Sequence, residues 1–309
     1  MTGGAGFVGS WLCERLLDLD IEVVCVDSFV TGSRDNIADL ERRGGFSVVE
    51  QDVSTGLDVD GEVDWVLHLA CPASPVDYLR LPIETMLVGS HGTKHALDLA
   101  EATGARFVLA STSEVYGDPA EHPQPETYWG NVNPVGPRSV YDESKRYAEA
   151  LTTAYRTARG VDTGIVRIFN TFGPRMRVDD GRAIPAFMSQ ALAGRPLTVA
   201  GDGSQTRSLC YVEDTVSGLV AMAASEHAGP VNIGSQEEMT MLALAERVRA
   251  LTGSASTVEF IDLPVDDPRV RRPDTRLAAQ VLGWGTQVSV EEGLKRTLEW
   301  FAAQTPATV

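Results

Sequence analysis

Short apolar runs alternate with longer amphipathic stretches through the first half of the chain. The short runs are rich in Val, Ile, Leu and Phe, which predicts buried strands of a sheet covered on both faces. The longer stretches have apolar residues at helical spacing. The predicted strands are 21–26, 46–49, 65–70, 106–110 and 163–168, and the predicted helices are 10–18, 82–103 and 142–159. This alternation predicts repeated βαβ units, and therefore an α/β fold with a doubly wound parallel sheet of the Rossmann type.

The regular alternation of apolar and amphipathic segments weakens after about residue 172, where segments containing Gly and Pro interrupt the apolar pattern. Further helices are predicted at 184–193, 241–252 and 290–303. We expect residues 1–172 to form a dinucleotide-binding domain and residues 173–309 to form mainly a smaller C-terminal α/β substrate lobe. The chain can cross between the two lobes.

The charge of the chain restricts its partners. Lys and Arg number 26 and Asp and Glu number 43, so the net charge is −17, which disfavours nucleic acid and anionic membranes as partners. The four cysteines form no CxxC pair, and we expect reduced thiols in a cytoplasmic protein. The first residues lack the charged and apolar regions of a signal peptide, and no run of about 18 apolar residues occurs, so we expect a soluble, cytoplasmic protein. Because the chain is acidic overall, an anionic substrate needs individually placed arginines.

Three glycines follow one another at three-residue intervals at the start of the chain. Gly3, Gly6 and Gly9 lie in the sequence TGGAGFVG, immediately before the first predicted helix. Backbone amides at such a helix start can face a pyrophosphate, although glycine clusters also mark ordinary turns. The fold requires a buried strand before this turn, and residues 1–2 are too short to form one. We therefore expect a truncated first strand, with native residues missing upstream.

An acidic residue stands where the second strand ends. Asp27 follows Gly9 by eighteen residues, at the position where a carboxylate can accept hydrogen bonds from the adenosine ribose. An acid there favours NAD over NADP, although Arg34 lies nearby and can in principle serve a 2′-phosphate. Asp52 and Val53, after the third strand, are candidate adenine contacts; the alternative for Asp52 is a solvated strand end.

Tyr141 and Lys145 lie four residues apart at the start of a predicted helix, so their side chains share one face. A neighbouring ammonium favours the phenolate form of a tyrosine, which can then act as a base. Thr112 ends the strand 106–110, where open α/β sheets bind ligands. Glu114 can position water or move a proton, or be a solvated turn residue. His91 and His95 lack a third ligand, and we predict no metal site.

Together these segments resemble the extended short-chain dehydrogenase/reductase family. The resemblance rests on residues 2–9, 111–119, 141–145 and 167–175, and it spans nearly the whole chain. Within the family, the stretches HLACPASP, STSEVYGDP, YWGNVNPVGPR and GDGSQTRS are similar to the nucleotide-sugar decarboxylases. Family members are usually homodimers through a four-helix bundle, which implies pairing here through residues 82–103 and 142–159.

One position separates the candidate reactions. The related 4,6-dehydratases carry an Asp-Glu pair after the strand-end threonine, whereas this chain has Ser113-Glu114. The missing carboxylate removes the expected acid for eliminating water. The resemblance therefore implies NAD-dependent decarboxylation of UDP-glucuronate to UDP-xylose, through C4 oxidation, loss of the carboxylate and reduction. A 4-epimerase or 4,6-dehydratase stays open as the second reading, and a non-catalytic NAD-binding regulator as the third.

The resemblance also assigns roles to individual residues. The predicted catalytic residues are Thr112, Glu114, Tyr141 and Lys145. The predicted NAD contacts are Gly3, Gly6, Phe7, Val8, Gly9, Asp27, Ser28, Thr31, Asp52, Val53, Leu69, Ala70, Cys71, Ala110, Tyr141, Lys145 and Thr171. The predicted contacts to the UDP-sugar are Ser113, Asn170, Arg182, Arg207, Tyr211 and Arg271.

Overall fold

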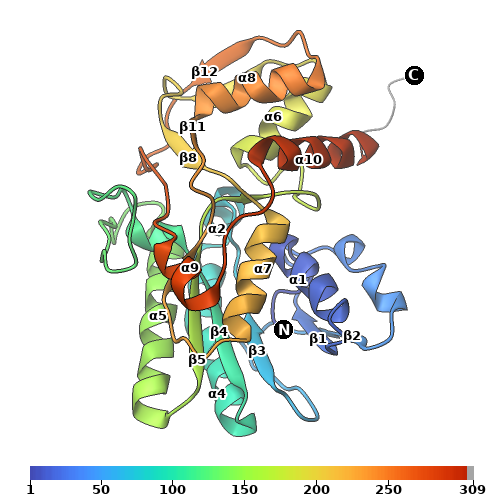
Figure 1. Ribbon diagram of the computed structural model, residues 1–309, viewed down its shortest axis with the longest axis vertical. Helices are drawn as coiled ribbons and strands as arrows, with labels where there is room; N and C mark the ends of the chain where they lie inside the picture. The colour runs from blue at the N-terminus through green and yellow to red at the C-terminus, as the bar shows by residue number, and fades with distance from the viewer. Residues whose placement is uncertain (305–309) are drawn as a thin grey trace.

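The computed structural model describes residues 1–304, and its centre is one parallel sheet (Figure 1). In one part of the sheet β1 pairs with β2, and in the other the strand order is β10-β5-β4-β3. The strands are β1 (Val23–Asp27), β2 (Phe46–Glu50), β3 (Trp65–His68), β4 (Arg106–Thr112), β5 (Thr163–Ile168) and β10 (Val231–Ile233). All of these pairings are parallel, which confirms the predicted doubly wound fold.

The first residues of the chain join the two parts of this sheet. Thr2 forms parallel bridges to Val26 in β1 and to His68 in β3. Its amide donates to Leu67 O at 3.0 Å, and Val26 N donates to Met1 O at 2.8 Å. Residues 1–2 thus lie where a central strand would be, and Thr2 pairs with both neighbouring strands through isolated β-bridges. The His68 ring is a buried core side chain beside Thr2, and its burial lowers its pKa to about 3.

Apolar side chains pack on both faces of the sheet. Val108 of β4 belongs to a core with α1 (Phe7–Leu17) and α7 (Val212–Ala223). Its neighbours Phe107 and Leu109 belong to a second core with α4 (Thr93–Thr103) and α5 (Ser139–Arg159). Successive strand residues point to opposite faces, so these two clusters are the two covered faces of the sheet. This explains why the strands are apolar runs without alternation.

The smaller lobe lies beyond the carboxyl ends of the strands (Figure 1). It contains α6, α8, α10 and three two-stranded pairs, and the chain returns to the main sheet through α7 and β10. The remaining elements are α2 (Pro75–Arg80), α3 (Pro82–Leu87), a π-helical turn (Val88–Gly92), β6 (Thr171–Phe172), α6 (Ala183–Leu192), β7 (Leu197–Ala200), β8 (Thr206–Ser208), β9 (Cys210–Tyr211), β11 (Glu238–Thr240), α8 (Met241–Thr252), β12 (Val258–Ile261), α9 (Arg276–Leu282) and α10 (Val290–Gln304).

The predicted helices agree closely with those of the structure. The predicted helix 82–103 is α3 and α4 joined by the π-helical turn, and α8 has the predicted bounds. Helices α2, α7 and α9 and the short strands of the smaller lobe were not predicted. Among residues 1–304, no helix has the length and apolarity needed to cross a membrane. The cytoplasmic location stays a prediction.

Candidate active site

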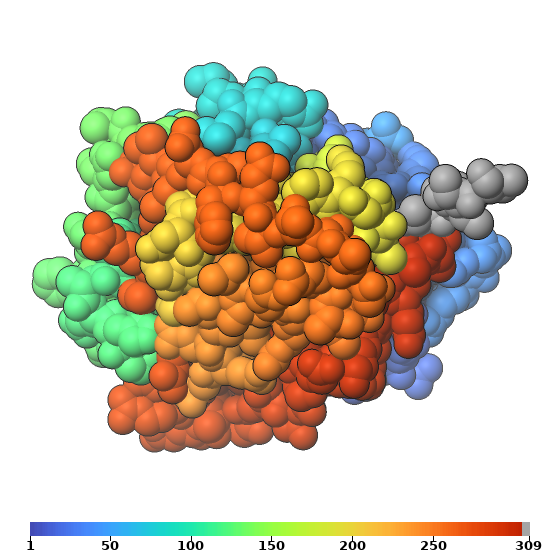
Figure 2. Space-filling view, turned by 90° about the horizontal axis from the view of Figure 1, so that it is seen from above, coloured from blue at the N-terminus to red at the C-terminus, as the bar shows by residue number. Residues whose placement is uncertain are grey.

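A cavity of about 820 Å³ lies between the carboxyl ends of the strands and the smaller lobe. The glycine turn and the ends of β1, β3, β4 and β5 line its floor, and residues of α6 and the 261–267 segment line its other side. Figure 2 shows the segments near residue 80, around α6 and around β12 side by side on the upper face. All of the predicted NAD contacts line this cavity.

The glycine turn leaves no room for side chains. Gly3 has φ +73°, and a Cβ there would lie 2.6 Å from Ala70 N; a Cβ at Gly9 would lie 2.1 Å from Gly3 O. Helix α1 begins at Phe7, and no side chain caps its first amides. These amides are free to bind a ligand at the positive end of the helix dipole, so the turn fits the diphosphate of a dinucleotide such as NAD.

Asp27 stands at the end of β1 beside this turn. Its two carboxylate oxygens accept hydrogen bonds from Ala5 N and Phe29 N, each at 2.9 Å. Burial raises the pKa of Asp27, while these amides counteract the rise. Arg34 lies outside the cavity lining and pairs with Glu50 at 2.6 Å. Because the charge of Arg34 is already compensated, this part of the cavity suits a ribose 2′-hydroxyl beside Asp27, as in NAD, better than a 2′-phosphate, as in NADP.

Tyr141 and Lys145 reach the cavity from the first turns of α5. Both are buried, and Lys145 Nζ donates to Ala110 O on β4 at 2.9 Å. Burial raises the pKa of the Tyr141 phenol well above its ordinary value, and a hydrogen bond to Thr112 counteracts this rise. The structure therefore brings together three of the four predicted catalytic residues on adjacent parts of α5 and β4.

Tyr78 of α2 is a cavity residue that the sequence analysis missed. Its ring stacks on that of Tyr141, with centroids 5.2 Å apart and an interplanar angle of 9°. The residue is 1% exposed and lines the cavity, yet its hydroxyl has no hydrogen-bond partner among the residues that the structure describes. Asn170 Nδ2 is likewise buried and unpaired in the cavity wall. Buried polar groups normally have partners, so both atoms are placed to bind a ligand.

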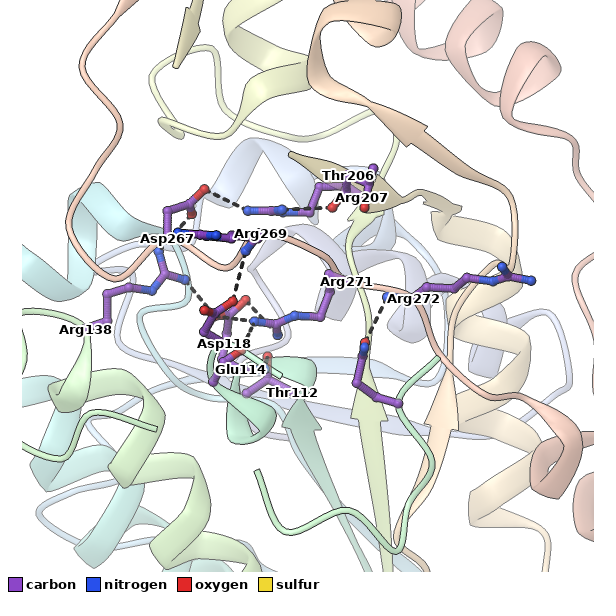
Figure 3. Close-up of polar contacts among 12 residues, drawn as sticks. Thr112, Glu114, Asp118, Arg138, Thr206, Arg207, Asp267, Arg269, Arg271 and Arg272 are labelled. Carbon is purple, nitrogen blue, oxygen red and sulfur yellow. Dashed lines mark hydrogen bonds and ion pairs between the residues drawn. The ribbon is translucent and has the colours of Figure 1, made fainter. Parts of the chain in front are cut away.

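A chain of alternating charges crosses the cavity wall between the lobes (Figure 3). Arg207 donates to Asp267 at 2.8 Å, and Asp267 lies 3.6 Å from Arg138. Arg138 in turn donates to Glu114 at 2.7 Å, and Glu114 lies 3.3 Å from Arg271. The three arginines exceed the two carboxylates by one charge, which makes this wall suitable for an anionic substrate. Sequence reasoning named Arg207 and Arg271 but missed Arg138.

The arginines determine the ionisation of Glu114. Burial alone would favour its neutral form, but the charges of Arg271 and Arg138 outweigh burial and lower the pKa of Glu114 to about 2. Glu114 is consequently an anion near neutral pH, able to accept hydrogen bonds. It holds no proton of its own to donate in this state.

The predicted substrate contacts are only partly on the cavity wall. Ser113, Asn170, Arg182 and Arg207 line it, and Arg182 is paired with Asp180. Arg271 lies behind Glu114 and donates to Gly117 O at 2.8 Å, so it contacts the wall indirectly.

Tyr211 requires a correction. It is buried in the core, where its ring packs edge-on against Phe172 and Trp11, and it does not line the cavity. Its proximity to Arg207 along the chain does not place it near the ligand, because β8 and β9 pair with different strands. Among residues 1–304, no group of three or more His, Cys, Asp or Glu side chains is arranged to hold a metal ion.

Comparisons with known proteins identify the family of this chain. Residues 1–234 match the model of the NAD dependent epimerase/dehydratase family. The chain belongs to this family. UDP-glucuronic acid decarboxylase 1 of Arabidopsis thaliana is 49% identical over 301 residues, which are 97% of this chain and 69% of that protein.

Solved structures of the family share the fold of this chain. A UDP-N-acetylglucosamine 4-epimerase from Methanobrevibacter ruminantium, in complex with UDP-N-acetylmuramic acid, has a TM-score of 0.90 and 26% identity, covering 98% of this chain and 97% of that one. A UDP-glucuronic acid 4-epimerase from Bacillus cereus, in complex with UDP-glucuronic acid and NAD, has a TM-score of 0.88 and 28% identity, covering 98% of both chains.

Proposed function

We propose that this protein uses NAD to decarboxylate UDP-glucuronate to UDP-xylose. The near-full-length similarity to UDP-glucuronic acid decarboxylases supports the substrate and the reaction. The observation that carries the choice among reactions is the Ser113-Glu114 pair beside Thr112. Glu114 is held as an anion by Arg138 and Arg271, and Ser113 cannot act as an acid at neutral pH. Neither residue can therefore protonate a leaving hydroxyl, as dehydration requires.

The residues of the site can perform each proton step of this reaction. NAD, when bound, supplies the hydride acceptor at C4 and returns the hydride at the end. Tyr141 takes the proton of the C4 hydroxyl, while Thr112 holds the same oxygen; the positive charges of Lys145 and of NAD, when bound, would offset the burial that raises the pKa of the Tyr141 phenol. The resulting C4 ketone is β to the carboxylate, so carbon dioxide can leave while the electrons pass to the ketone oxygen. Donors already directed at that oxygen stabilise the enolate.

Glu114 acts later in this scheme. Because Glu114 is an anion, its role is to orient a water molecule that delivers a proton to C5 of the enolate. Tyr141 then returns its proton to the C4 oxygen as the ketone is reduced. The hydride removed at C4 is the hydride that returns, so the overall reaction needs no external oxidant or reductant: UDP-glucuronate takes up one solvent proton at C5 and gives UDP-xylose and carbon dioxide.

The unpaired polar atoms of the cavity are assigned to the substrate. Tyr78 and Asn170 line the cavity, and we assign the unpaired hydroxyl of Tyr78 and the unpaired Nδ2 of Asn170, both buried, as donors to sugar or phosphate oxygens. Arg207 is assigned to the diphosphate, since it lies on the side of the smaller lobe, and Asp267 is its one ion-pair partner among residues 1–304. Arg182 lines the same cavity as Tyr141, and the positive charge of Arg182 counteracts the rise in the pKa of the Tyr141 phenol, so we assign Arg182 to the reacting end of the substrate.

Product analysis tests this function. The purified protein is incubated with NAD and UDP-glucuronate, and the nucleotide sugars are separated by liquid chromatography and mass spectrometry. The expected product is a UDP-pentose that co-elutes with UDP-xylose. A UDP-sugar that retains six carbons would instead indicate an epimerase or a dehydratase.

We also infer that the protein forms a homodimer through α3 and α5, which pack against each other. Ile83, Met86 and Leu87 of α3 and Tyr147 of α5 are exposed apolar or aromatic side chains. A helical bundle with a second copy would cover them. Light scattering should give a dimer for the parent and a monomer for the double variant Ile83→Glu/Met86→Glu; a parent that is monomeric at all concentrations would contradict the inference.

A further inference from the structure

The face of α5 that carries Tyr141 and Lys145 also carries the carboxylate of Glu149. Glu149 follows Lys145 by four residues, so the three side chains lie in a row along the helix. Their partners are three consecutive residues at the end of β4. Lys145 binds Ala110 O, Glu149 binds Ser111, and Tyr141 binds Thr112. The row therefore connects α5 to the strand end that carries the reacting groups.

Glu149 is the most strongly bound member of this row. Its Oε1 accepts from Ser111 Oγ at 2.6 Å and from Arg167 Nε at 2.9 Å, and its Oε2 accepts from Arg167 Nη2 at 2.7 Å. The side chains of Glu149 and Arg167 are only 14% and 11% exposed. A two-pronged pair of this kind has fixed geometry, and charge-assisted bonds strengthen away from water. The carboxylate thus joins α5 to both β4 and β5.

Arg167 is itself held in place from a third strand. Its Nη1 donates to the hydroxyl of Tyr116 at 2.9 Å, and its guanidinium lies 4.8 Å from the centre of that ring. The Tyr116 hydroxyl donates to Asn232 Oδ1 on β10 at 2.8 Å. Because every group in this network has a partner, the position of Glu149 is set by the sheet rather than by α5 alone.

We propose that Glu149 is a positioning residue for the reaction: acting through Ser111 and Arg167, it fixes the register of α5 against β4 and thereby holds the Tyr141 phenol beside Thr112. Glu149 does not line the cavity and contacts no reacting atom. The proposal rests on the proposed function, in which Tyr141 and Thr112 share the C4 oxygen. A displacement of about 1 Å in such a pair can lower the rate on the order of 100-fold.

The mildest test is Ser111→Ala, which removes one bond to Glu149 and keeps the buried ion pair. Glu149→Gln is the stronger variant, and it keeps the shape of the side chain. The matched control is Tyr155→Phe, which removes the hydrogen bond of Tyr155 to Asp98 at 2.5 Å, an anchor of the same helix away from the cavity. The expected kcat falls about 10-fold for Ser111→Ala and further for Glu149→Gln, with KM and NAD affinity within about twofold. Tyr155→Phe should keep the parent kcat.

A readout without substrate separates this proposal from the proposed function. Amide hydrogen exchange in residues 139–146 should accelerate in Ser111→Ala and stay unchanged in Tyr155→Phe. If both variants lose thermal stability equally and neither changes kcat or this exchange, Glu149 is only structural and the proposal is wrong. If the parent forms a six-carbon product, the proposed function is wrong, while the same kcat comparison on that product and the exchange data still decide the role of Glu149.

Discussion

Gly9 offers the sharpest test of the dinucleotide turn, because a side chain there has no room. In Gly9→Ala the new Cβ would lie 2.1 Å from Gly3 O, whereas real Cβ contacts begin near 3.0 Å, so the turn must move by about 0.9 Å. Hydrogen bonds from nitrogen to oxygen span only about 2.7–3.2 Å, so this shift breaks an amide contact to the diphosphate. A bond to a charged group is worth about 1.5–3 kcal/mol, which is roughly 10- to 100-fold in affinity.

The assay is titration of NAD by calorimetry, together with thermal unfolding. Gly9→Ala should bind NAD at least about 10-fold more weakly and unfold at a lower temperature, because the better helix propensity of alanine, about 1 kcal/mol, is smaller than the cost of the clash. The matched control is Gly285→Ala, where an added Cβ meets no atom within 4 Å. Unchanged NAD affinity and stability in Gly9→Ala would refute the placement of the dinucleotide on this turn.

Three further substitutions test the chemistry of the site. Tyr141→Phe should lower kcat at least about 100-fold with NAD affinity within twofold, since the phenol acts on a proton; near-normal turnover would remove it from this role. Tyr78→Phe should raise KM for UDP-glucuronate about threefold or more, and an unchanged KM would contradict its substrate contact. Burial, followed by the charge of Glu114, raises the pKa of the Asp142 carboxyl to about 7. Between the ordinary pKa of 3.8 and about pH 7, the native state therefore keeps a proton on Asp142 that the unfolded state has lost. The free energy of unfolding of the parent is therefore unreduced by Asp142 below pH 3.8 and falls as the pH rises toward 7. Asp142→Asn, which cannot ionise, should therefore exceed the parent in Tm at pH 8 and match it near pH 4; an equal Tm difference at both pH values would contradict this assignment.

Local spacing explains what the sequence predicted well. The glycine turn, Asp27 and the Tyr141–Lys145 pair each depend on residues close together in the chain, where helix and strand periodicity determines the geometry. Tyr78 and Arg138 were missed because tertiary packing alone brings their side chains to the cavity. Tyr211 was misplaced for the same reason, since its contacts are with Trp11 and Phe172 in the core.

Helix α7 illustrates a misleading local signal. Gly218 lies in the middle of this helix, and a Cβ there would lie 2.8 Å from Ile233 of β10. The glycine therefore permits close packing of helix on strand, whereas in a sequence it indicates a break. The strands of the smaller lobe have only two to four residues, as β9 (Cys210–Tyr211) and β7 (Leu197–Ala200) show, so they are too short to display a period.

The fate of one carbon tests the central claim most directly. The protein is incubated with NAD and UDP-glucuronate labelled with ¹³C at the carboxylate, and labelled carbon dioxide and UDP-pentose are quantified together while absorbance at 340 nm is followed. Decarboxylation with return of the hydride predicts one labelled carbon dioxide for each UDP-pentose, an unlabelled sugar and no lasting accumulation of NADH. Label retained in a six-carbon UDP-sugar would contradict the account.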